Sequence, residues 1–414
     1  MAIDNKDKKV LKSSIEREQN EVACSAECEK IKGSKNLNVP PLRFPEFTEE
    51  WRSHFLTDFM SFKNGMNPDA KRFGRGTKFI SVMDILNNQF ICYDNIRASV
   101  EVMDGDIDTY GVNYGDILFQ RSSETLEDVG QANVYLDSKP AIFGGFVIRG
   151  KSKGNYNPLF FRYLLASPTA RKRIIVKGAG AQHFNIGQDG LSKVSLDIPC
   201  MQEQKKIGEL LQCIDARIAT QNKIIDKLQS LIKGISNKIF ATIQGIEYRM
   251  GNIVTISNGN SNVQDAVTES KDGLYPFFDR SENIKYLPTF LFDKEAIIYP
   301  GEGAEFMPRY FRGKFALHQR CYAIFDFKEI INAQFLYFYL KTQNSYFVRN
   351  AVGSTVPSLR LDTFQKLKVI IPPKKIQHSV SLYLSSMEQK CNVEKDILQK
   401  LLKQKQYLLR QMFI

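Results

Sequence analysis

Basic side chains occur in several short stretches together with glycines, amides and aromatic rings. Arg and Lys contact phosphates or guanine edges, and Asn and Gln can read adenine, so this combination is suited to DNA. Ordinary surface charge explains any one stretch equally well, and the prediction therefore depends on their recurrence in both halves of the chain. We expect these stretches to be loops, and the candidate DNA-binding residues are Arg72, Arg75, Lys78, Arg121, Ser122, Gln182, His183, Arg280, Arg309, Arg312, Lys314, Gln319, Arg320, Ser354 and Thr355.

Motifs for catalysis by this chain are not found. Asn157-Pro158-Leu159-Phe160 is similar to the N-P-P-F motif that holds an adenine amino group in N6-methyltransferases. The corresponding Asn332-Ala333-Gln334-Phe335 indicates instead that each Asn caps a helix and each Phe faces the core. Gly301-Glu302-Gly303-Ala304 lacks a third glycine and fits neither a dinucleotide fingerprint nor a P-loop. The four histidines are isolated, and Cys24 and Cys28 have no second Cys or His pair nearby, so we predict no catalytic residue, no metal site and no cofactor in this chain.

Composition places the chain among globular proteins. Its 414 residues are enough for two or three domains, and a net charge of +12 favours a polyanionic partner. It contains no apolar run of about 18 residues, and the segment before Asn38 is polar, so neither a membrane span nor a signal peptide is expected. With scattered cysteines, these observations predict a cytoplasmic protein with reduced thiols.

An internal duplication dominates the sequence. The segment Gly180–Phe240 recurs 173 positions later as Gly353–Phe413, without a gap. Two units with so long a period indicate two similar domains related by an approximate two-fold axis, rather than a solenoid.

Each copy ends in a helix of about forty residues, over Met201–Phe240 and Lys374–Phe413, which corresponds to a length of about 60 Å. Apolar residues alternate in steps of four and three, as on a coiled-coil seam, so we expect the helices to pair antiparallel. The alternative is that each helix packs on its own domain. Gln221, Glu394 and Lys405 interrupt the seam, and the predicted helix-pairing residues are Ile207, Leu211, Ile214, Ile218, Ile225, Leu228, Ile235, Val380, Leu384, Met387, Leu398, Leu401 and Leu408.

The predicted fold class is α+β, with two similar domains that are each followed by a long helix. The five expected segments are a polar, disordered extension (1–39), a first domain (40–199), a first spacer helix (200–245), a second domain (246–373) and a second spacer helix (374–414). The front halves of the two domains diverge in sequence. Strands are expected at 78–82, 116–119, 141–148, 296–299 and 316–324, and shorter helices at 157–170 and 333–342.

The chain resembles the specificity subunit of type I DNA restriction-modification systems. The resemblance covers residue 40 to the C-terminus and depends on Leu42-Arg43-Phe44-Pro45-Glu46-Phe47 before Trp51, Phe79-Ile80-Ser81-Val82-Met83-Asp84-Ile85, Gly115-Asp116-Ile117-Leu118-Phe119, and the Gly180 and Gly353 loops that lead through Ile198-Pro199 and Ile371-Pro372 into the long helices.

This resemblance implies a non-catalytic subunit whose two domains each read one half of a bipartite target in double-stranded DNA. It implies two modification subunits as partners, which use S-adenosylmethionine to methylate adenine N6. It also implies restriction subunits that use ATP and Mg for translocation and cleavage. Two other functions stay open, a stand-alone DNA methyltransferase and a coiled-coil scaffold that does not bind DNA.

Overall fold

The computed structural model of this chain describes residues 37–180 and 183–414. Most of the extension predicted over 1–39, and the candidate Gln182, therefore lie outside the described residues. The chain divides into two compact units. The described part of the first comprises residues 37–215 without 181–182, together with Lys403–Ile414, and the second comprises Ala216–Leu402.

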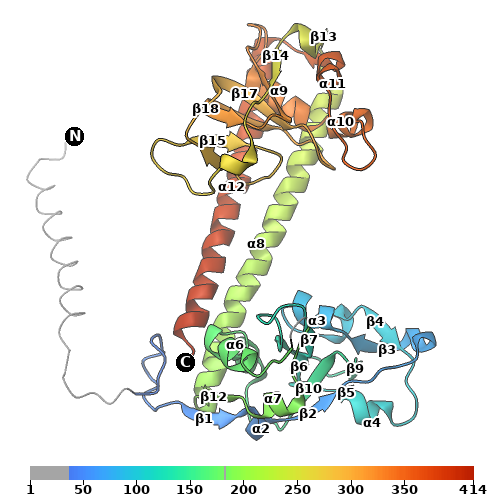
Figure 1. The fold of residues 1–414 in the computed structure, drawn as a ribbon, viewed down its shortest axis with the longest axis vertical. Helices are drawn as coiled ribbons and strands as arrows, with labels where there is room; N and C mark the ends of the chain where they lie inside the picture. Colours follow the sequence, from blue (N-terminus) through green and yellow to red (C-terminus); the bar gives the residue numbers. More distant parts are fainter. Residues whose placement is uncertain (1–36, 181–182) are drawn as a thin grey trace, which may run out of the picture. The chain divides into compact units, whose positions relative to one another are not determined.

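The first unit has two four-stranded sheets flanked by short helices (Figure 1). One sheet has the order β2 (Met60–Asn64), β10 (Val147–Ser152), β6 (Ile117–Gln120), β8 (Ala132–Val134), and the other has β4 (Ala98–Val100), β3 (Phe73–Ile80), β9 (Ala141–Phe143), β5 (Gly111–Val112). Two small pairs complete it, β1 (Arg52–Phe55) with β12 (Ser195–Ile198), and β7 (Ser122–Ser123) with β11 (Phe184–Asn185). Its short helices are α2 (Leu56–Phe59), α3 (Val82–Asn87), α4 (Asp106–Tyr110), α5 (Pro158–Leu164), α6 (Pro168–Ile175) and α7 (Gln188–Ser192).

The second unit is built around one six-stranded sheet. Its order is β14 (Thr255–Asn258), β19 (Cys321–Phe325), β17 (Phe292–Pro300), β18 (Arg309–Leu317), β15 (Tyr275–Phe278), β16 (Lys285–Leu287). A pair of β13 (Ile246–Arg249) and β20 (Lys368–Ile371) corresponds to β1 and β12. The core packs this sheet against α9 (Ala333–Lys341), α10 (Asn344–Asn350) and α11 (Leu361–Lys366).

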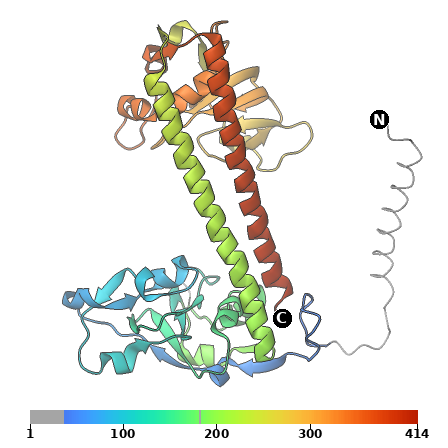
Figure 2. The same cartoon turned by 180° about the vertical axis from the view of Figure 1, so that it is seen from behind.

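Two long helices, α8 (Met201–Thr242) and α12 (Lys374–Gln411), follow β12 and β20. Within the second unit they run side by side and antiparallel (Figures 1 and 2), because Gln221 contacts Glu394 while Phe240 shares a core with Leu384. In the first unit, the Asp215 carboxylate lies 2.6 Å from Lys405 Nζ. The expected α+β fold with paired helices is confirmed, and the alternative that each helix packs only on its own domain is wrong.

Two predicted strands are each divided by a turn. The segment expected at 141–148 is β9 and β10, and the segment expected at 316–324 is parts of β18 and β19. The Val147 N–H donates to Gly144 O, and the Cys321 N–H donates to His318 O, so a three-residue turn separates the two strands in each case. The apolar residues on both sides of the turn concealed it in the sequence.

Two other boundaries also differ from the prediction. The helix expected at 157–170 is interrupted, because the Ser167 hydroxyl caps a new helix, α6, that has Pro168 in its first turn. The strand expected at 78–82 ends at Ile80, since Ser81 and Asp84 form a capping box that starts α3. In the part of the chain that is described, no helix is long and apolar enough to cross a membrane.

Candidate nucleic-acid interface

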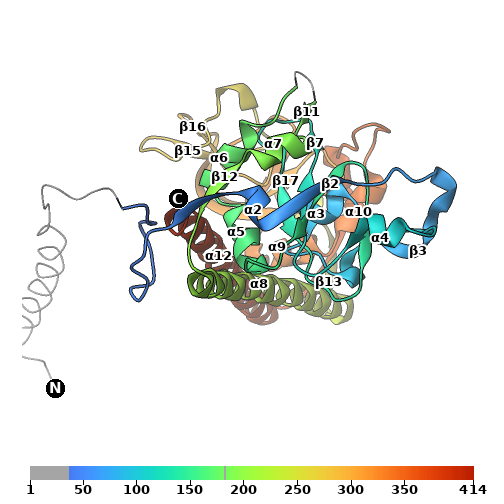
Figure 3. The same ribbon diagram turned by 90° about the horizontal axis from the view of Figure 1, so that it is seen from below.

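Four chain segments meet at one edge of the first unit, which we call the first loop edge. It comprises Gly65–Met66, Arg121–Ser123, Gly144–Phe146 and the described part of Gly180–Asn185. Two backbone hydrogen bonds join these segments to strands, from Gly144 N to Ile80 O and from Met66 N to Phe143 O. Two others link Arg121 to its neighbours, from Arg121 N to Phe146 O and from Ile186 N to Arg121 O, and all four are 2.9–3.1 Å long. The pairing of β7 with β11, visible in Figure 3, brings the Arg121 and His183 segments side by side.

The second unit repeats this arrangement at a second loop edge, formed by Gly259–Ser261, Gly301–Gly303, His318–Arg320 and Val352–Ser358. The corresponding hydrogen bonds run from His318 N to Phe278 O, Ser261 N to Leu317 O, and Leu359 N to Gly301 O, at 2.8–3.1 Å. Ser358 pairs with Glu302 as Asn185 pairs with Ser122. Asn185 and Ser358 are themselves 173 residues apart, which is the offset of the duplication. The front halves, which diverge in sequence, therefore share a backbone framework.

Glycine is required where this framework is tightest. A Cβ atom on Gly65 would lie 2.0 Å from Gly144 O, and one on Gly259 would lie 2.0 Å from Leu317 O. Both glycines follow an asparagine, as Asn64-Gly65 and Asn258-Gly259, and Asn-Gly is a common turn signal in a sequence.

Side chains on the shared framework differ between the two edges. The turn Gly144-Gly145-Phe146 corresponds to His318-Gln319-Arg320, and Arg121-Ser122 corresponds to Gly301-Glu302. The same backbone thus presents two different sets of chemical groups.

At the first loop edge, three of the candidate residues come together. Arg121 Nη1 lies 3.4 Å from Gly145 O, the Ser122 hydroxyl donates to the Asn185 side chain, and His183 is exposed nearby. Phe146, which the sequence reasoning missed, is 69% exposed at the tip of the turn. Its ring is therefore accessible to a partner at this edge.

The other candidates of the first unit lie elsewhere and have internal partners. Arg72 donates to the Glu101 carbonyl and pairs with Asp106, Arg75 pairs with the Glu101 carboxylate, and Lys78 donates to Ile96 O. These residues belong to a short 3-10 turn and to β3, so the expectation of a basic loop at 71–78 was wrong.

At the second loop edge, Arg280, Gln319 and Arg320 surround a hollow of about 540 Å³. Burial favours the neutral form of Asp279 in its wall, but hydrogen bonds from Lys285 and Ser281 outweigh this effect and hold the pKa of Asp279 below its usual range. Burial also lowers the pKa of His318, so this imidazole is neutral at pH 7. Ser354 and Thr355 are exposed in the neighbouring Val352–Ser358 segment.

Three other candidates, Arg309, Arg312 and Lys314, lie on strand β18 rather than in a loop. Arg309 donates to Ser281 O and so supports the hollow from behind. Arg312 lies opposite Glu295 on β17, and Lys314 lies over the ring of Phe290.

The Asn157 motif is structural. Asn157 Oδ1 accepts from Phe160 N, and Asn332 Oδ1 accepts from Phe335 N, each at 2.9 Å, while both Phe rings are buried. Gln204 and Gln377 accept from the backbone N–H of the two Asn residues. Across residues 37–180 and 183–414, no cluster of three or more His, Cys, Asp or Glu could hold a metal ion.

The thirteen predicted helix-pairing residues are all buried or half-buried on α8 and α12. The buried residues are Ile207, Leu211, Ile214, Ile225, Leu384, Leu401 and Leu408. The half-buried residues are Ile218, Leu228, Ile235, Val380, Met387 and Leu398.

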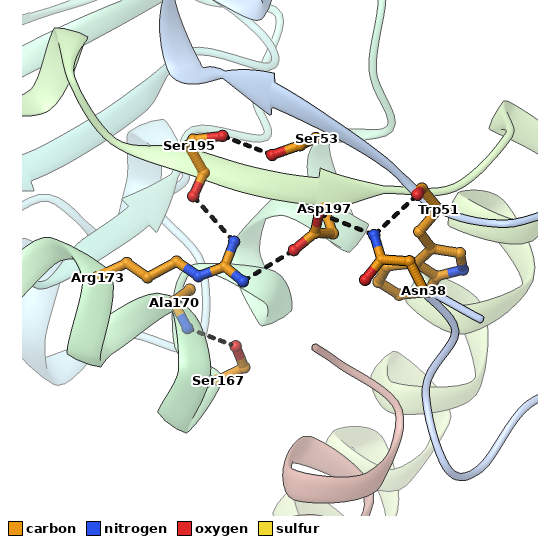
Figure 4. Close-up of polar contacts among 8 residues, drawn as sticks. All are labelled: Asn38, Trp51, Ser53, Ser167, Ala170, Arg173, Ser195 and Asp197. Carbon is orange, nitrogen blue, oxygen red and sulfur yellow. Dashed lines mark hydrogen bonds and ion pairs between the residues drawn. The ribbon is translucent and has the colours of Figure 1, made fainter. Parts of the chain in front are cut away.

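A strap formed by residues 37–51 joins several parts of the first unit. Arg43 contacts Glu203 at the start of α8 through two bonds of 2.7 Å, and Leu42 N donates to Gln411 O at the end of α12. In Figure 4, Asn38 lies between Trp51 O and Asp197, and Arg173 contacts Asp197 from the other side. This strap holds the end of α12 against the first unit.

Comparison with known proteins agrees with this architecture. The family described as "Type I restriction modification DNA specificity domain" matches residues 48–230 and 246–403. The type I restriction enzyme EcoDI specificity subunit of Escherichia coli is 29% identical over 138 residues, which cover 33% of this chain and 30% of that protein. The EcoKI specificity subunit of E. coli K12 is 23% identical over 235 residues, covering 52% and 50%. The chain thus spans about half or less of the length of these relatives.

A solved structure has the same fold over most of this chain. It is the S subunit of a type I restriction-modification system from M. genitalium, with a TM-score of 0.60 and 16% identity. The match covers 91% of this chain and 99% of that one.

Proposed function

This chain belongs to the family of type I restriction modification DNA specificity domains, and we propose that it is the DNA-recognition subunit of a type I restriction-modification enzyme. Each domain reads one half of a bipartite target in double-stranded DNA. The subunit has no catalytic role, and it directs adenine-N6 methylation or cleavage by partner subunits in the cytoplasm.

The observation that carries this proposal is the repeated loop edge. One backbone framework occurs twice and presents Gly145, Phe146 and Ser122 in one copy but Gln319, Arg320 and Glu302 in the other. Bases are distinguished by the pattern of donors and acceptors on their edges. Two different half-sites therefore need two different sets of side chains, each held in place by a fixed backbone. Two such edges suit two half-sites of different sequence.

The long helices supply a surface for the modification subunits. Ile224, Leu231, Val393 and Ile397 are 38–52% exposed on α8 and α12 within the second unit, although the opposite faces of these helices are covered. Exposed apolar patches are typical of protein–protein interaction sites, and these residues support such a use of the helices. We propose that two modification subunits, which bring S-adenosylmethionine, dock on the helices, and that restriction subunits with ATP and Mg join that complex.

Exchange of residues 258–347, which carry most of the second loop edge, tests the proposal. The chain is expressed with a modification subunit, and N6-methyladenine is mapped in cellular DNA. We expect one split motif. Replacing 258–347 by the equivalent region of a related specificity subunit should change only the second half of that motif, and a change in both halves would contradict independent reading by the two domains.

The same experiment distinguishes the two other functions. A stand-alone methyltransferase would methylate DNA when the purified chain is given S-adenosylmethionine alone, and we expect no methylation. A scaffold without a DNA role would give no split motif and no salt-sensitive, specific DNA binding with the modification subunit present.

A further inference from the structure

We infer that Arg320, at the tip of the second loop edge, reads a guanine in the second half-site and that Glu302 orients its guanidinium for this contact. The inference rests on the proposed function, and it assigns base reading to one side chain among the fifteen candidates.

The backbone of Arg320 is held in place by its turn. His318 N donates to Phe278 O at 2.9 Å, Gln319 N donates to Ser261 O at 3.1 Å, and Arg320 N donates to His318 Nδ1 at 3.2 Å. The strands on both sides, β18 and β19, end in buried residues at this turn. The backbone position from which the Arg320 side chain extends is therefore fixed, as direct base readout requires.

The guanidinium is also oriented, although most of it is accessible. Arg320 Nη1 lies 2.5 Å from Glu302 Oε1, and the Arg320 side chain is 63% exposed while that of Glu302 is 18% exposed. Glu302 is itself fixed by its bridge to Ser358. An arginine has five N–H donors in a planar fork, so one contact with Glu302 leaves donors for the O6 and N7 acceptors of guanine.

Two of the other candidate arginines of the second unit, Arg309 and Arg312, are less suited to this role. Arg309 is committed to Ser281 O beneath the hollow, and Arg312 projects from the middle of β18 opposite Glu295. At the equivalent position of the first loop edge stands Phe146, which has no side-chain donor but can contact a thymine methyl group. The two edges therefore differ in chemistry at the tip of the same turn.

Replacing Arg320 by Lys separates base reading from phosphate binding, because Lys keeps the charge but loses the planar fork. The variants Arg320→Lys and Arg320→Ala are expressed with the modification subunit, and N6-methyladenine is mapped. Binding is also measured on duplexes in which each base pair of the second half-site is changed in turn. Both variants should lose discrimination at one guanine by about 10- to 100-fold, with the first half-site unchanged.

Arg349→Ala is the matched control, since it removes an exposed arginine of the same unit that lies on α10, outside the second loop edge, and should leave the motif unaltered. If Arg320→Lys keeps the wild-type motif and Arg320→Ala weakens binding to all duplexes equally, Arg320 contacts phosphate and the inference is wrong, while the proposed function stands. The absence of a split motif with the wild-type chain would instead contradict the proposed function. Because Arg320 is exposed, thermal unfolding of its variants should match that of the wild type, which separates a reading defect from misfolding.

Discussion

At the scale of single residues, the ion pair of Arg43 with Glu203 is the most deeply buried charge pair of the strap. The side chains are 12% and 0% exposed, and Glu203 raises the pKa of Arg43 through its hydrogen bond. Removing one partner of such a pair leaves the other charge buried without compensation. The strap is thus attached to α8 by an interaction whose loss should be costly.

We therefore expect Arg43→Ala to lower the local unfolding free energy at the start of α8 by about 3–5 kcal/mol. Hydrogen exchange of the amides around Glu203 measures this, since it reports local opening in a chain of more than one unit. The double variant Arg43→Ala with Glu203→Ala should lose less than the single variant, because no charge stays buried. Equal losses in both would contradict the penalty expected from a Glu203 carboxylate that stays buried without its partner.

A second prediction at the same scale concerns the cap of α5. Asn157→Ala removes the bond from Phe160 N and should lower the unfolding free energy by about 1 kcal/mol, as other N-cap losses do. In the complex with the modification subunit, the methylated motif should be unchanged. Asn332→Ala is the equivalent variant in the second unit, and loss of methylation in Asn157→Ala alone would favour a catalytic role for Asn157.

At the scale of helices, Gln221 and Glu394 stand out because they are 173 residues apart and contact each other. Gln221 Nε2 donates to Glu394 Oε2 at 2.6 Å and to Glu394 O at 3.0 Å, and Gln221 is 8% exposed. In an antiparallel pair of equivalent helices, only residues at the symmetry axis meet their own counterparts. Because a polar pair on an apolar seam has a partner in one register only, it selects that register.

Gln221→Glu should destabilise the helix pair by about 2 kcal/mol, since a charge-assisted hydrogen bond is replaced by two adjacent carboxylates. The exchanged pair, Gln221→Glu with Glu394→Gln, should recover most of this loss. An amide donor and a carboxylate acceptor meet again, with the carboxylate now on α8 and the amide on α12. Thermal unfolding of the wild type, Gln221→Glu, Glu394→Gln and the double variant gives the coupling free energy of the two residues. Additive effects in this cycle would contradict a direct role of the contact in helix pairing.

The boundaries of helices and strands show which parts of the fold were predictable from the sequence. The long helices were predictable because a coiled-coil seam is a local, repeated pattern, and so was the Asn cap of α9. The turns inside 141–148 and 316–324 were not, because they depend on backbone hydrogen bonds to distant residues such as Ile80 and Phe278. Every residue carries a backbone N–H or C=O, so such bonds leave little trace in side-chain types.

At the scale of the whole molecule, we propose that the paired helices set the gap between the two half-sites. Insertion of one heptad into both α8 and α12 would preserve the seam and lengthen the pair by about 10 Å, which corresponds to about 3 base pairs of DNA. The methylated motif should keep both half-sites and gain that many unspecified positions. An unchanged gap in a folded variant would remove the idea that the helices act as a ruler.

The amino-acid sequence by itself determined that the molecule is built twice and that each copy ends in a long helix, because duplication and helical periodicity are written in order along the chain. Only the tertiary structure decided which basic side chains stay accessible. Arg72 and Arg320 look alike in sequence and each has an acidic partner, yet the Arg72 side chain is 14% exposed whereas the Arg320 side chain, at the tip of a loop edge, is 63% exposed. The availability of a charge depends on partners that are remote in the sequence, and folding alone brings these partners into contact.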